Sequence, residues 1–452
     1  MKKLVVLFLL IVISNGYSQC WSDVYLGGRH TYGLKTDGTI WYTGDNTYGQ
    51  LGDGTNVTKY VFTQFSNNSL WSTFCLGESF TIAIKTDESL WSWGINSNGE
   101  LGDNTNVNKN LPVRVGFDNN WVKISSGRNH SLALKSDGTL WSWGLNNRGQ
   151  LGDGTNISKS NPTQIGTDNN WLKINCGSNH SLAIKTDGSL WAWGENAGKL
   201  GDGTTIDRNI PVLIGNYYNW DNVYGGVNST VAIKTDGTIW SWGNNTYGEL
   251  GIGNTTPVYF PTQIGNSNDW QSIKYSGHHV LATKSNGTIW AWGNNNAYRL
   301  GDGTTINRNF PIQIGINQDW SSIYASNFNG GCSIALKTDN SMFIWGWAQW
   351  GALGNGGGAL VQVPTALGNC NLSNEDFNQD KLTIYPNPTK NILNIETKNI
   401  LQKTIIYNIL GAKVIEQNFN TTIDVSNLAN GLYIIKCYGD DNEQYVGKFV
   451  KE

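Results

Sequence analysis

The sequence predicts an all-β protein, in which a seven-bladed β-propeller is followed by a small immunoglobulin-like β-sandwich. A tryptophan returns at an almost constant interval through most of the chain. Each interval contains short stretches of alternating apolar and polar residues separated by glycine turns, which is the pattern of antiparallel strands. The last part of the chain keeps strand-like stretches but loses the interval, which indicates a second domain.

The interval is defined by the leading tryptophans of successive copies. The steps between them are 50 residues, with one step of 49. GENAGKLG from Gly194 lacks one residue relative to GLNNRGQLG from Gly144, so a single loop deletion explains the shorter step. A period of this length with strand-like content is typical of a propeller, in which neighbouring copies cover each other's apolar faces. The leading residues are Trp21, Trp71, Trp121, Trp171, Trp220, Trp270 and Trp320.

The third copy illustrates the strands of one blade. Residues 121–126 (WVKISS) alternate, and residues 130–135 (HSLALK) and 139–144 (TLWSWG) flank Asp137-Gly138. Asp-Gly between two alternating runs favours a hairpin, because glycine accepts the positive φ of such a turn. Residues 162–166 (PTQIG) are expected to complete the copy as a fourth strand. A proline at the first position of that strand suits the edge of a sheet.

Two tryptophans lie two positions apart in the third predicted strand, as in Trp141 and Trp143. Side chains at this spacing lie on the same side of a strand, so the pair presents one broad apolar surface. Carbohydrate stacking is one interpretation, but a position that repeats from copy to copy favours packing between blades. The equivalent pairs are Trp91/Trp93, Trp191/Trp193, Trp240/Trp242 and Trp290/Trp292.

Composition limits the class of partner. Of the 452 residues, 14% are charged, and the formal net charge is -3. The chain therefore offers no strongly basic surface that could follow the phosphate backbone of a nucleic acid. We expect no nucleic-acid partner.

The N-terminal residues are predicted to be a targeting segment. Lys2 and Lys3 precede an apolar run at 4–13, which is shorter than the roughly 20 residues of a transmembrane helix. Residues 1–19 therefore resemble a signal peptide, cleaved near Gln19. A lipoprotein anchored at Cys20 is the alternative, and it is disfavoured because Gln19 stands where such a site has a small residue. We find no later transmembrane segment in the sequence.

The repeated strings HSLALKSDGTLWSWG and GQLGDGT, with a proline-led strand after them, resemble the regulator of chromosome condensation repeat. The resemblance extends from Trp21 to Gly368. It implies a seven-bladed propeller whose loops bind proteins, since protein binding is what the characterised members share. The members otherwise differ, because the family includes a guanine-nucleotide exchange factor and a secreted bacterial β-lactamase inhibitor.

Polar residues that repeat from copy to copy are expected to be structural. Four histidines share one position, and separate blades would hold them apart, which argues against a metal cluster. The aspartate of LGDGT is followed by too few oxygen ligands for calcium, so we expect it to form a turn. A lysine or arginine four residues after the threonine is predicted to pair within its blade, although a cationic ring for an acidic partner is the alternative. These residues are His30, His130, His180 and His279; Asp53, Asp103, Asp153, Asp202 and Asp302; and Lys59, Lys109, Lys159, Arg208 and Arg308.

The sequence contains neither G-x-S-x-G nor H-E-x-x-H, and G-x-x-x-G-K at 194–199 does not match a phosphate-binding loop. We expect no catalytic residue, no cofactor and no metal. Residues that differ between copies are the better candidates for binding a partner, because the shared ones build the blade. After the third strand these candidates are Tyr48, Arg148, Tyr247, Trp347 and Trp350. Ordinary loop variation is the alternative interpretation.

Cys20 and Cys370 are predicted to form a disulfide. Four residues connect each copy to the next tryptophan, and both cysteines fall inside what would be the last such connector of a closed ring. An oxidising compartment permits the bond. Cys75, Cys176 and Cys332 come from different copies and different positions, so we expect them to stay unpaired. The sequence places Cys437 in another domain.

The C-terminal part begins with a polar linker at 371–380, and a small β-domain is predicted at 381–452. YPNPT, YNILGAKV, DVSNLANGLYIIK and the final KFVKE resemble a type IX secretion sorting domain of type A. The resemblance implies recognition by the type IX machinery, export across the outer membrane and removal of this domain. The protein would then be secreted or held at the cell surface. An adhesive immunoglobulin-like module is the alternative.

The sequence therefore predicts an exported propeller at residues 20–370 that acts by binding another protein, with a glycan as the second choice of ligand. An extracellular glycan-active or other hydrolytic enzyme and a structural surface component are alternatives of other classes. Two carboxylates converging in a central pocket would favour the enzyme.

Overall fold

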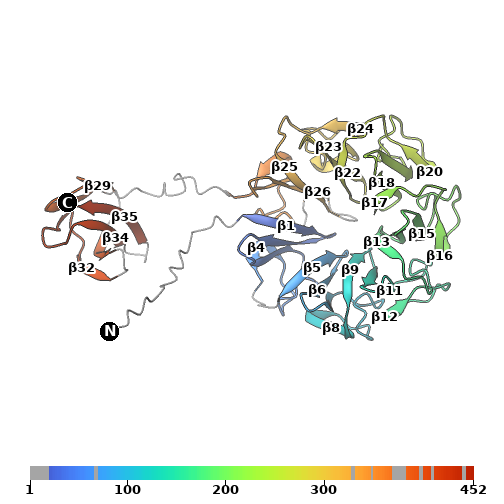
Figure 1. Ribbon diagram of the computed structural model, residues 1–452, viewed down its shortest axis with the longest axis horizontal. Helices are drawn as coiled ribbons and strands as arrows, with labels where there is room; N and C mark the ends of the chain where they lie inside the picture. Colours follow the sequence, from blue (N-terminus) through green and yellow to red (C-terminus); the bar gives the residue numbers. More distant parts are fainter. Residues whose placement is uncertain are drawn as a thin grey trace, which may run out of the picture. The chain divides into compact units, whose positions relative to one another are not determined.

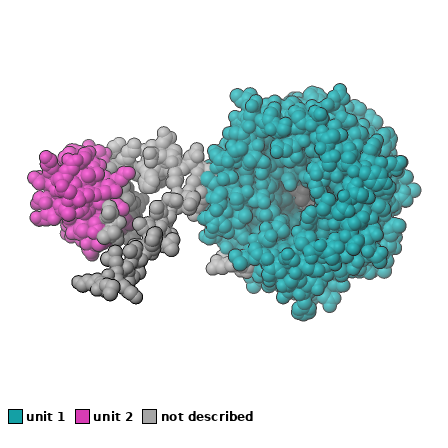
Figure 2. Space-filling model, in the orientation of Figure 1, with its two compact units in different colours: residues 1–370 teal, residues 371–452 magenta. Residues whose placement is uncertain are grey.

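The computed structural model describes residues 20–65, 70–326, 331–347, 350–368, 383–396, 401–408, 412–439 and 444–452. The chain divides into two compact units, residues 1–370 and 371–452, and each is described by itself (Figures 1 and 2). In the described residues, no helix is long and apolar enough to cross a membrane.

Unit 1 is a propeller of seven four-stranded antiparallel sheets, each built from consecutive strands. Blade 1 contains β1 (Trp21–Leu26), β2 (His30–Lys35), β3 (Ile40–Gly44) and β4 (Lys59–Gln64). Blade 2 contains β5 (Trp71–Leu76), β6 (Phe80–Lys85), β7 (Ser89–Gly94) and β8 (Lys109–Asn119). Blade 3 contains β9 (Trp121–Ser126), β10 (His130–Lys135), β11 (Leu140–Gly144) and β12 (Lys159–Gln164). Blade 4 contains β13 (Trp171–Cys176), β14 (His180–Lys185), β15 (Leu190–Gly194) and β16 (Arg208–Leu213).

The remaining blades repeat this order. Blade 5 contains β17 (Trp220–Gly225), β18 (Ser229–Lys234), β19 (Ile239–Gly243) and β20 (Val258–Gln263). Blade 6 contains β21 (Trp270–Tyr275), β22 (His279–Lys284), β23 (Ile289–Gly293), the short 3-10 helix η1 (Asn296–Tyr298) and β24 (Arg308–Gln313). Blade 7 contains β25 (Trp320–Ala325), β26 (Gly331–Lys337), β27 (Met342–Trp347) and β28 (Val361–Ala366). The predicted fold class is confirmed, and each blade begins with its leading tryptophan.

The first strand of each blade lies nearest the axis and the fourth lies at the outside (Figure 1). The fourth strand begins earlier than the sequence pattern predicts, since β12 starts at Lys159 and Pro162 is its fourth residue rather than its first. The proline still suits its place, because an outermost strand has one side without a partner in its own sheet. Five other blades have an equivalent proline, and blade 1 has Phe62 instead.

The cores lie between neighbouring blades. Trp143 of blade 3 is fully buried and packs with Phe80 and Leu101 of blade 2. Its indole Nε1 donates a 2.9 Å hydrogen bond to the carbonyl of Glu100, also in blade 2. Packing between blades, rather than an open column for carbohydrate, is therefore the role of this tryptophan position. The partner Trp141 is half-buried and carries the Lys135 ammonium 4.0 Å from its ring centroid.

The ring closes directly between blades 7 and 1, since β1 contacts both β5 and β25. The Trp21 amide donates to the Asn340 carbonyl at 3.1 Å, and the Thr31 hydroxyl donates to the Ala352 carbonyl at 2.6 Å. The Phe62 ring lies 4.6 Å from the Trp21 ring, and it packs in a seam where blade 1 lacks the buried tryptophan of the other blades. Thr43 occupies that tryptophan position.

Unit 2 is a small β-sandwich. One sheet has the order β29-β30-β33 and the other β32-β31-β34-β35. Leu393 and Ile395 of the first sheet share a core with Ile406, Ile435 and Phe449 of the second. The sequence pattern missed β33, which is only three residues long and pairs with β30. The strands are β29 (Thr383–Tyr385), β30 (Ile392–Glu396), β31 (Leu401–Asn408), β32 (Lys413–Asn418), β33 (Thr422–Asp424), β34 (Gly431–Gly439) and β35 (Gln444–Lys451).

Candidate functional site on the loop face and the propeller axis

The repeated histidines connect neighbouring blades. Nε2 of His130 lies 3.0 Å from the Ser181 hydroxyl of the next blade, and that hydroxyl donates to the Gln150 carbonyl at 2.7 Å. Because the hydroxyl hydrogen is already used, Nε2 must donate, so the ring is the neutral Nε2–H tautomer. Burial lowers the pKa of His130 to about 3. His30, His180 and His279 make the same contact, to Thr81, Thr230 and Ser333.

These histidines are structural, as predicted: the Nε2 of each contacts a side-chain hydroxyl, and that hydroxyl donates to a backbone carbonyl. Burial also lowers the pKa of His30 to about 3 and that of His180 and His279 well below the ordinary value. The described residues contain no group of three or more side chains that could hold a metal ion.

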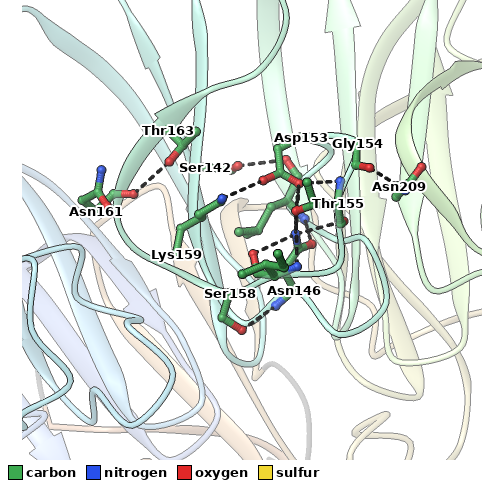
Figure 3. A network of polar contacts seen from close by, with 12 residues as sticks. Ser142, Asn146, Asp153, Gly154, Thr155, Ser158, Lys159, Asn161, Thr163 and Asn209 are labelled. Carbon is green, nitrogen blue, oxygen red and sulfur yellow. Dashed lines mark hydrogen bonds and ion pairs between the residues drawn. The ribbon is translucent and has the colours of Figure 1, made fainter.

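The repeated aspartates organise the long loop between the third and fourth strands (Figure 3). Oδ1 of Asp153 accepts hydrogen bonds from the Thr155 amide and hydroxyl and from the Asn146 side-chain amide, at 2.8 to 3.1 Å. Hydrogen bonds from Thr155 and Asn146 lower the pKa of Asp153 and outweigh its partial burial. Lys159 lies 3.5 Å from the other carboxylate oxygen.

Each of the other repeated cations also pairs with the aspartate of its own blade, which confirms the predicted pairing. The pairs are Lys59–Asp53, Lys109–Asp103, Arg208–Asp202 and Arg308–Asp302. Neither the aspartates nor the cations therefore form a separate binding ring.

The loops that differ between blades lie together at one end of the propeller. Because the strands of a blade alternate in direction, the connections from first to second strand and from third to fourth strand share that end. In blade 1 these connections are residues 27–29 and 45–58. We call this end the loop face.

The five predicted partner-binding residues lie on the loop face, spread over four blades. Tyr48 is half-buried in blade 1. Arg148 is exposed in blade 3 and lies 3.5 Å from Asp207. Tyr247 is half-buried in blade 5, where its ring lies 5.5 Å from that of His278. In blade 7, Trp347 and Trp350 keep 36% and 39% of their surface exposed. The described contacts join no two of the five directly.

Three residues that the sequence reasoning missed connect part of this set. The Arg29 guanidinium lies 5.2 Å from the Trp350 ring centroid and 3.5 Å from Glu78. Glu78 also pairs with Arg128 at 2.6 Å. Glu78 and Arg128 then line a hollow of about 450 Å³ that also contains Arg148. A continuous row of charged and aromatic side chains therefore runs from blade 7 through blades 1 and 2 to blade 3, and we call it the seam row.

A second hollow lies on the propeller axis, where Figure 2 shows unit 1 recessed at its centre. Its volume is about 270 Å³, and all seven innermost strands line it. The fifth residue of each innermost strand contributes, so every blade supplies one side chain. These residues are Tyr25, Cys75, Ser125, Asn175, Tyr224, Lys274 and Tyr324. We call this hollow the axial pocket.

The sequence contained a signal for both missed sets. Glu78 and Arg128 occupy a position that is Gly28 in the first copy, and the axial position carries five residue types in the seven copies. The criterion that selected Tyr48 and Trp350 applies equally to these positions. The sequence pattern alone does not reveal which strand of a blade is innermost.

Several predictions fall on residues that the structure does not describe. The signal peptide at 1–19, the linker at 371–380 and Cys370 are among them, so the Cys20–Cys370 disulfide stays a prediction. Cys20 itself is buried. The structure leaves Cys75, Cys176 and Cys332 as free thiols, as predicted.

Comparisons with known proteins agree with this architecture. The RCC1-like domain family matches residues 62–379, and the regulator of chromosome condensation (RCC1) repeat matches residues 14–50. The first match covers more than half of the chain, so the protein belongs to the RCC1-like domain family. The secretion system C-terminal sorting domain matches residues 383–452. This sorting domain implies export to the cell surface or the surroundings.

Solved structures show the same fold at low identity. Yeast RCC1 (Prp20), in a structure with Kap60, is 21% identical with a TM-score of 0.65, over 78% of this chain and 86% of that one. Prp20p from Saccharomyces cerevisiae is 22% identical with a TM-score of 0.60, over 68% and 80% of the two chains. Human WBSCR16 is 21% identical with a TM-score of 0.60, over 68% and 85%. A search of curated protein sequences found no match.

Proposed function

We propose that this protein is an exported binding module that recognises another protein through its loop face. The observation that carries the proposal is the exposed Trp350 ring with the Arg29 guanidinium stacked 5.2 Å from its centroid. Tryptophan and arginine are enriched among the residues that dominate protein–protein binding energy. Arg29 also contacts Glu78, which restricts its side chain before a partner arrives.

The rest of the seam row supports a protein rather than a neutral glycan as the ligand. Its hollow is lined by Glu78, Arg128, Arg148 and Glu195, so side chains of both charge signs face it. Such a pattern selects a partner surface of complementary charge. Among solved relatives, the structure of Prp20p is described with its binding properties to Gsp1p and histones, which are proteins.

The enzyme alternative gains no specific support from the axial pocket. Asp23 is the one carboxylate among the described residues that line it. Glycoside hydrolysis generally uses a pair of carboxyl groups at a defined separation. The structural-component alternative likewise has no specific observation behind it.

Export is part of the proposal. We infer that residues 1–19 direct the chain across the inner membrane as a signal peptide and that the type IX machinery recognises residues 383–452. The match of the latter segment to a secretion sorting domain supports this route. Removal of the sorting domain at the surface would leave the propeller as the mature module.

The experiment is affinity capture with the full chain from extracellular extracts, using Arg29→Ala/Trp350→Ala as the test variant. Phe117→Ala is the control, because Phe117 is 93% exposed and lies near the end of β8 that points away from the loop face. The proposal predicts a protein captured by the wild type and by the control, with at least tenfold less capture by the test variant. Equal capture by all three chains would contradict it.

A further inference from the structure

The axial pocket carries an inference that is independent of the loop face, because none of its lining residues belongs to the seam row. The fifth residue of the innermost strand is the same position in every blade, yet it presents tyrosine, cysteine, serine, asparagine and lysine side chains. The structural positions described above keep one residue type in most blades. The variation here therefore gives the axis a chemically asymmetric lining.

Most polar groups in the pocket already have partners. The Tyr324 hydroxyl donates to Asp23 at 2.7 Å, and Asp23 also accepts from the Val24 amide at 2.8 Å. Ser125 accepts from the Cys176 amide at 3.0 Å. The pocket acid is thus held by groups of the protein itself.

Lys274 differs from these groups. Its ammonium faces the Tyr224 ring at 5.7 Å, and no hydrogen bond or ion pair holds its Nζ among the described residues. The other lysines near the axis are satisfied, since Lys123 donates to the Leu172 carbonyl and Lys173 pairs with Asp221, each at 2.7 Å. Lys274 is therefore the one axial cation of the described residues that is available to an anionic ligand.

We propose that the axial pocket binds a small hydroxylated carboxylate, of which a hexuronic acid is the simplest example, through an ion pair between the ligand carboxylate and Lys274. The tyrosine rings of Tyr25 and Tyr224 supply apolar surface for the C–H face of a sugar. Asn175 and the Ser125 hydroxyl supply polar atoms for the ligand hydroxyls.

The size and charge of the pocket narrow the choice of ligand. Its volume of about 270 Å³ is near the lower end of small-molecule sites, so one sugar ring is a better match than a longer segment. Lys274 supplies the positive charge among the described lining residues, and the Asp23 carboxylate, which accepts hydrogen bonds from Tyr324 and Val24, supplies the negative one. Burial lowers the pKa of Lys274, opposed by Asp23 and Cys75, and an incoming carboxylate would favour the charged form.

The test is isothermal titration of the full chain with galacturonate and glucuronate, with galactose and glucose as neutral analogues. We expect at least tenfold weaker binding of each neutral sugar than of its acid. Lys274→Met should weaken binding of the acid at least tenfold, whereas Lys123→Met, which makes the same charge change outside the pocket, should change it less than twofold. Thermal unfolding of each variant checks that the propeller is intact.

A second arm uses oligosaccharides that end in the same hexuronic acid, because the ligand could be a free sugar acid or the end of a polymer. Binding of either form supports the proposal, and the preferred form identifies the source. Two results would overturn it: no binding of either form, or binding of acid and neutral sugar with equal affinity. The comparison of acid with neutral sugar uses only the wild type, so it decides the question even if Lys274→Met fails to fold.

Discussion

The hydroxyl of Tyr324 donates a 2.7 Å hydrogen bond to Oδ1 of Asp23, a residue 301 positions earlier in the chain. This contact joins the innermost strand of the last blade to that of the first. Burial and the neighbouring Asp23 carboxylate both raise the pKa of Tyr324, so the phenol stays a donor at physiological pH. The bond therefore contributes directly to closing the ring.

We predict that Tyr324→Phe lowers the free energy of unfolding by about 1 to 3 kcal/mol, because a partly buried carboxylate loses a donor. Urea titration measures the change. Tyr224→Phe is the matched control, since it removes a hydroxyl from the same position of another blade where no described hydrogen bond depends on it. Equal losses in the two variants would show that the contact has no special role in closure.

The interblade histidines predict how stability depends on pH. An unfolded histidine has a pKa of about 6.5, whereas burial holds that of His130 at about 3. Between these values the unfolded chain binds more protons, so the free energy of unfolding decreases as the pH falls through this window. Above about pH 7 both states are neutral, and the histidines add no pH dependence.

Each buried histidine should contribute a slope of roughly 1 kcal/mol per pH unit within that window. His130→Phe tests this contribution, because Phe80 already occupies the equivalent position in blade 2. Chemical denaturation between pH 4 and pH 7 should give a smaller slope for the variant than for the wild type. An unchanged slope would contradict the assignment.

Replacing Lys135, which is stacked on two tryptophans, should lower the free energy of unfolding more than replacing the lysine of an exposed ion pair. Lys135 lies 4.7 Å from the Trp121 ring and 4.0 Å from the Trp141 ring, and it pairs with Asp118 at 2.7 Å. Lys135→Met should lower the free energy of unfolding by about 1 to 2 kcal/mol, because the cation is largely desolvated between the rings.

Lys173→Met provides the comparison for that variant. Lys173 pairs with Asp221 at the same distance of 2.7 Å, but both side chains are substantially exposed. Lys173→Met should therefore lower the free energy of unfolding by less than about 1 kcal/mol. Denaturant midpoints of the two variants give the difference, and similar values for both would argue against a contribution from the rings.

The loop of blade 5, which lacks the repeated aspartate, provides the design for a rescue experiment in the LGDGT loop of blade 3. In blade 5, Ile252 replaces the aspartate, and the side-chain oxygen of Asn254 serves as the acceptor. It accepts from the Asn245 side-chain amide at 3.4 Å and from the Thr256 amide at 2.8 Å. Asp153→Ile should destabilise the propeller by about 1 to 3 kcal/mol, since several donors lose their acceptor. Adding Thr155→Asn reproduces the blade 5 pattern and should recover part of the loss. Thermal unfolding of the single and double variants checks this, and a double variant no more stable than the single one would contradict it.

The predicted Cys20–Cys370 disulfide can be tested by mass mapping of the non-reduced protein. Closing a loop of this length is worth about 5 to 6 kcal/mol in the chain-entropy model. We therefore expect a linked peptide pair and a lower melting temperature after reduction. A free Cys20 thiol in the exported protein would exclude the bond.

The blade count and strand order could be predicted from the sequence because each copy repeats the same alternation and a similar two-residue turn. The turn is Asp-Gly in four copies, and Asp87-Glu88, Asn286-Gly287 and Asp339-Asn340 in the other three. The start of β12 could not, since Lys159 to Asn161 carry no alternation and are placed by pairing with β11 and by the loop of the preceding blade. The strand β33 was missed because its three residues acquire strand geometry only from β30. Local pattern determines long strands, whereas tertiary pairing determines short ones.

The candidate site was harder to predict than the fold. Arg29 and Trp350 are more than 300 residues apart in the sequence, and only closure of the ring brings their side chains together. The axial residues can be predicted only if the innermost strand of each blade is known. The leading tryptophan alone does not identify that strand. Variation between copies marked both regions, but their convergence depends on the circular arrangement.

Phe62 and Thr43 give the first copy a different contact surface from that of the internal copies, and this surface faces blade 7 through Trp21. The specialised residues of the junction thus belong to the terminal units, while the units between them are close to interchangeable. Duplication or loss of an internal unit in the gene would leave the matched ends unaltered.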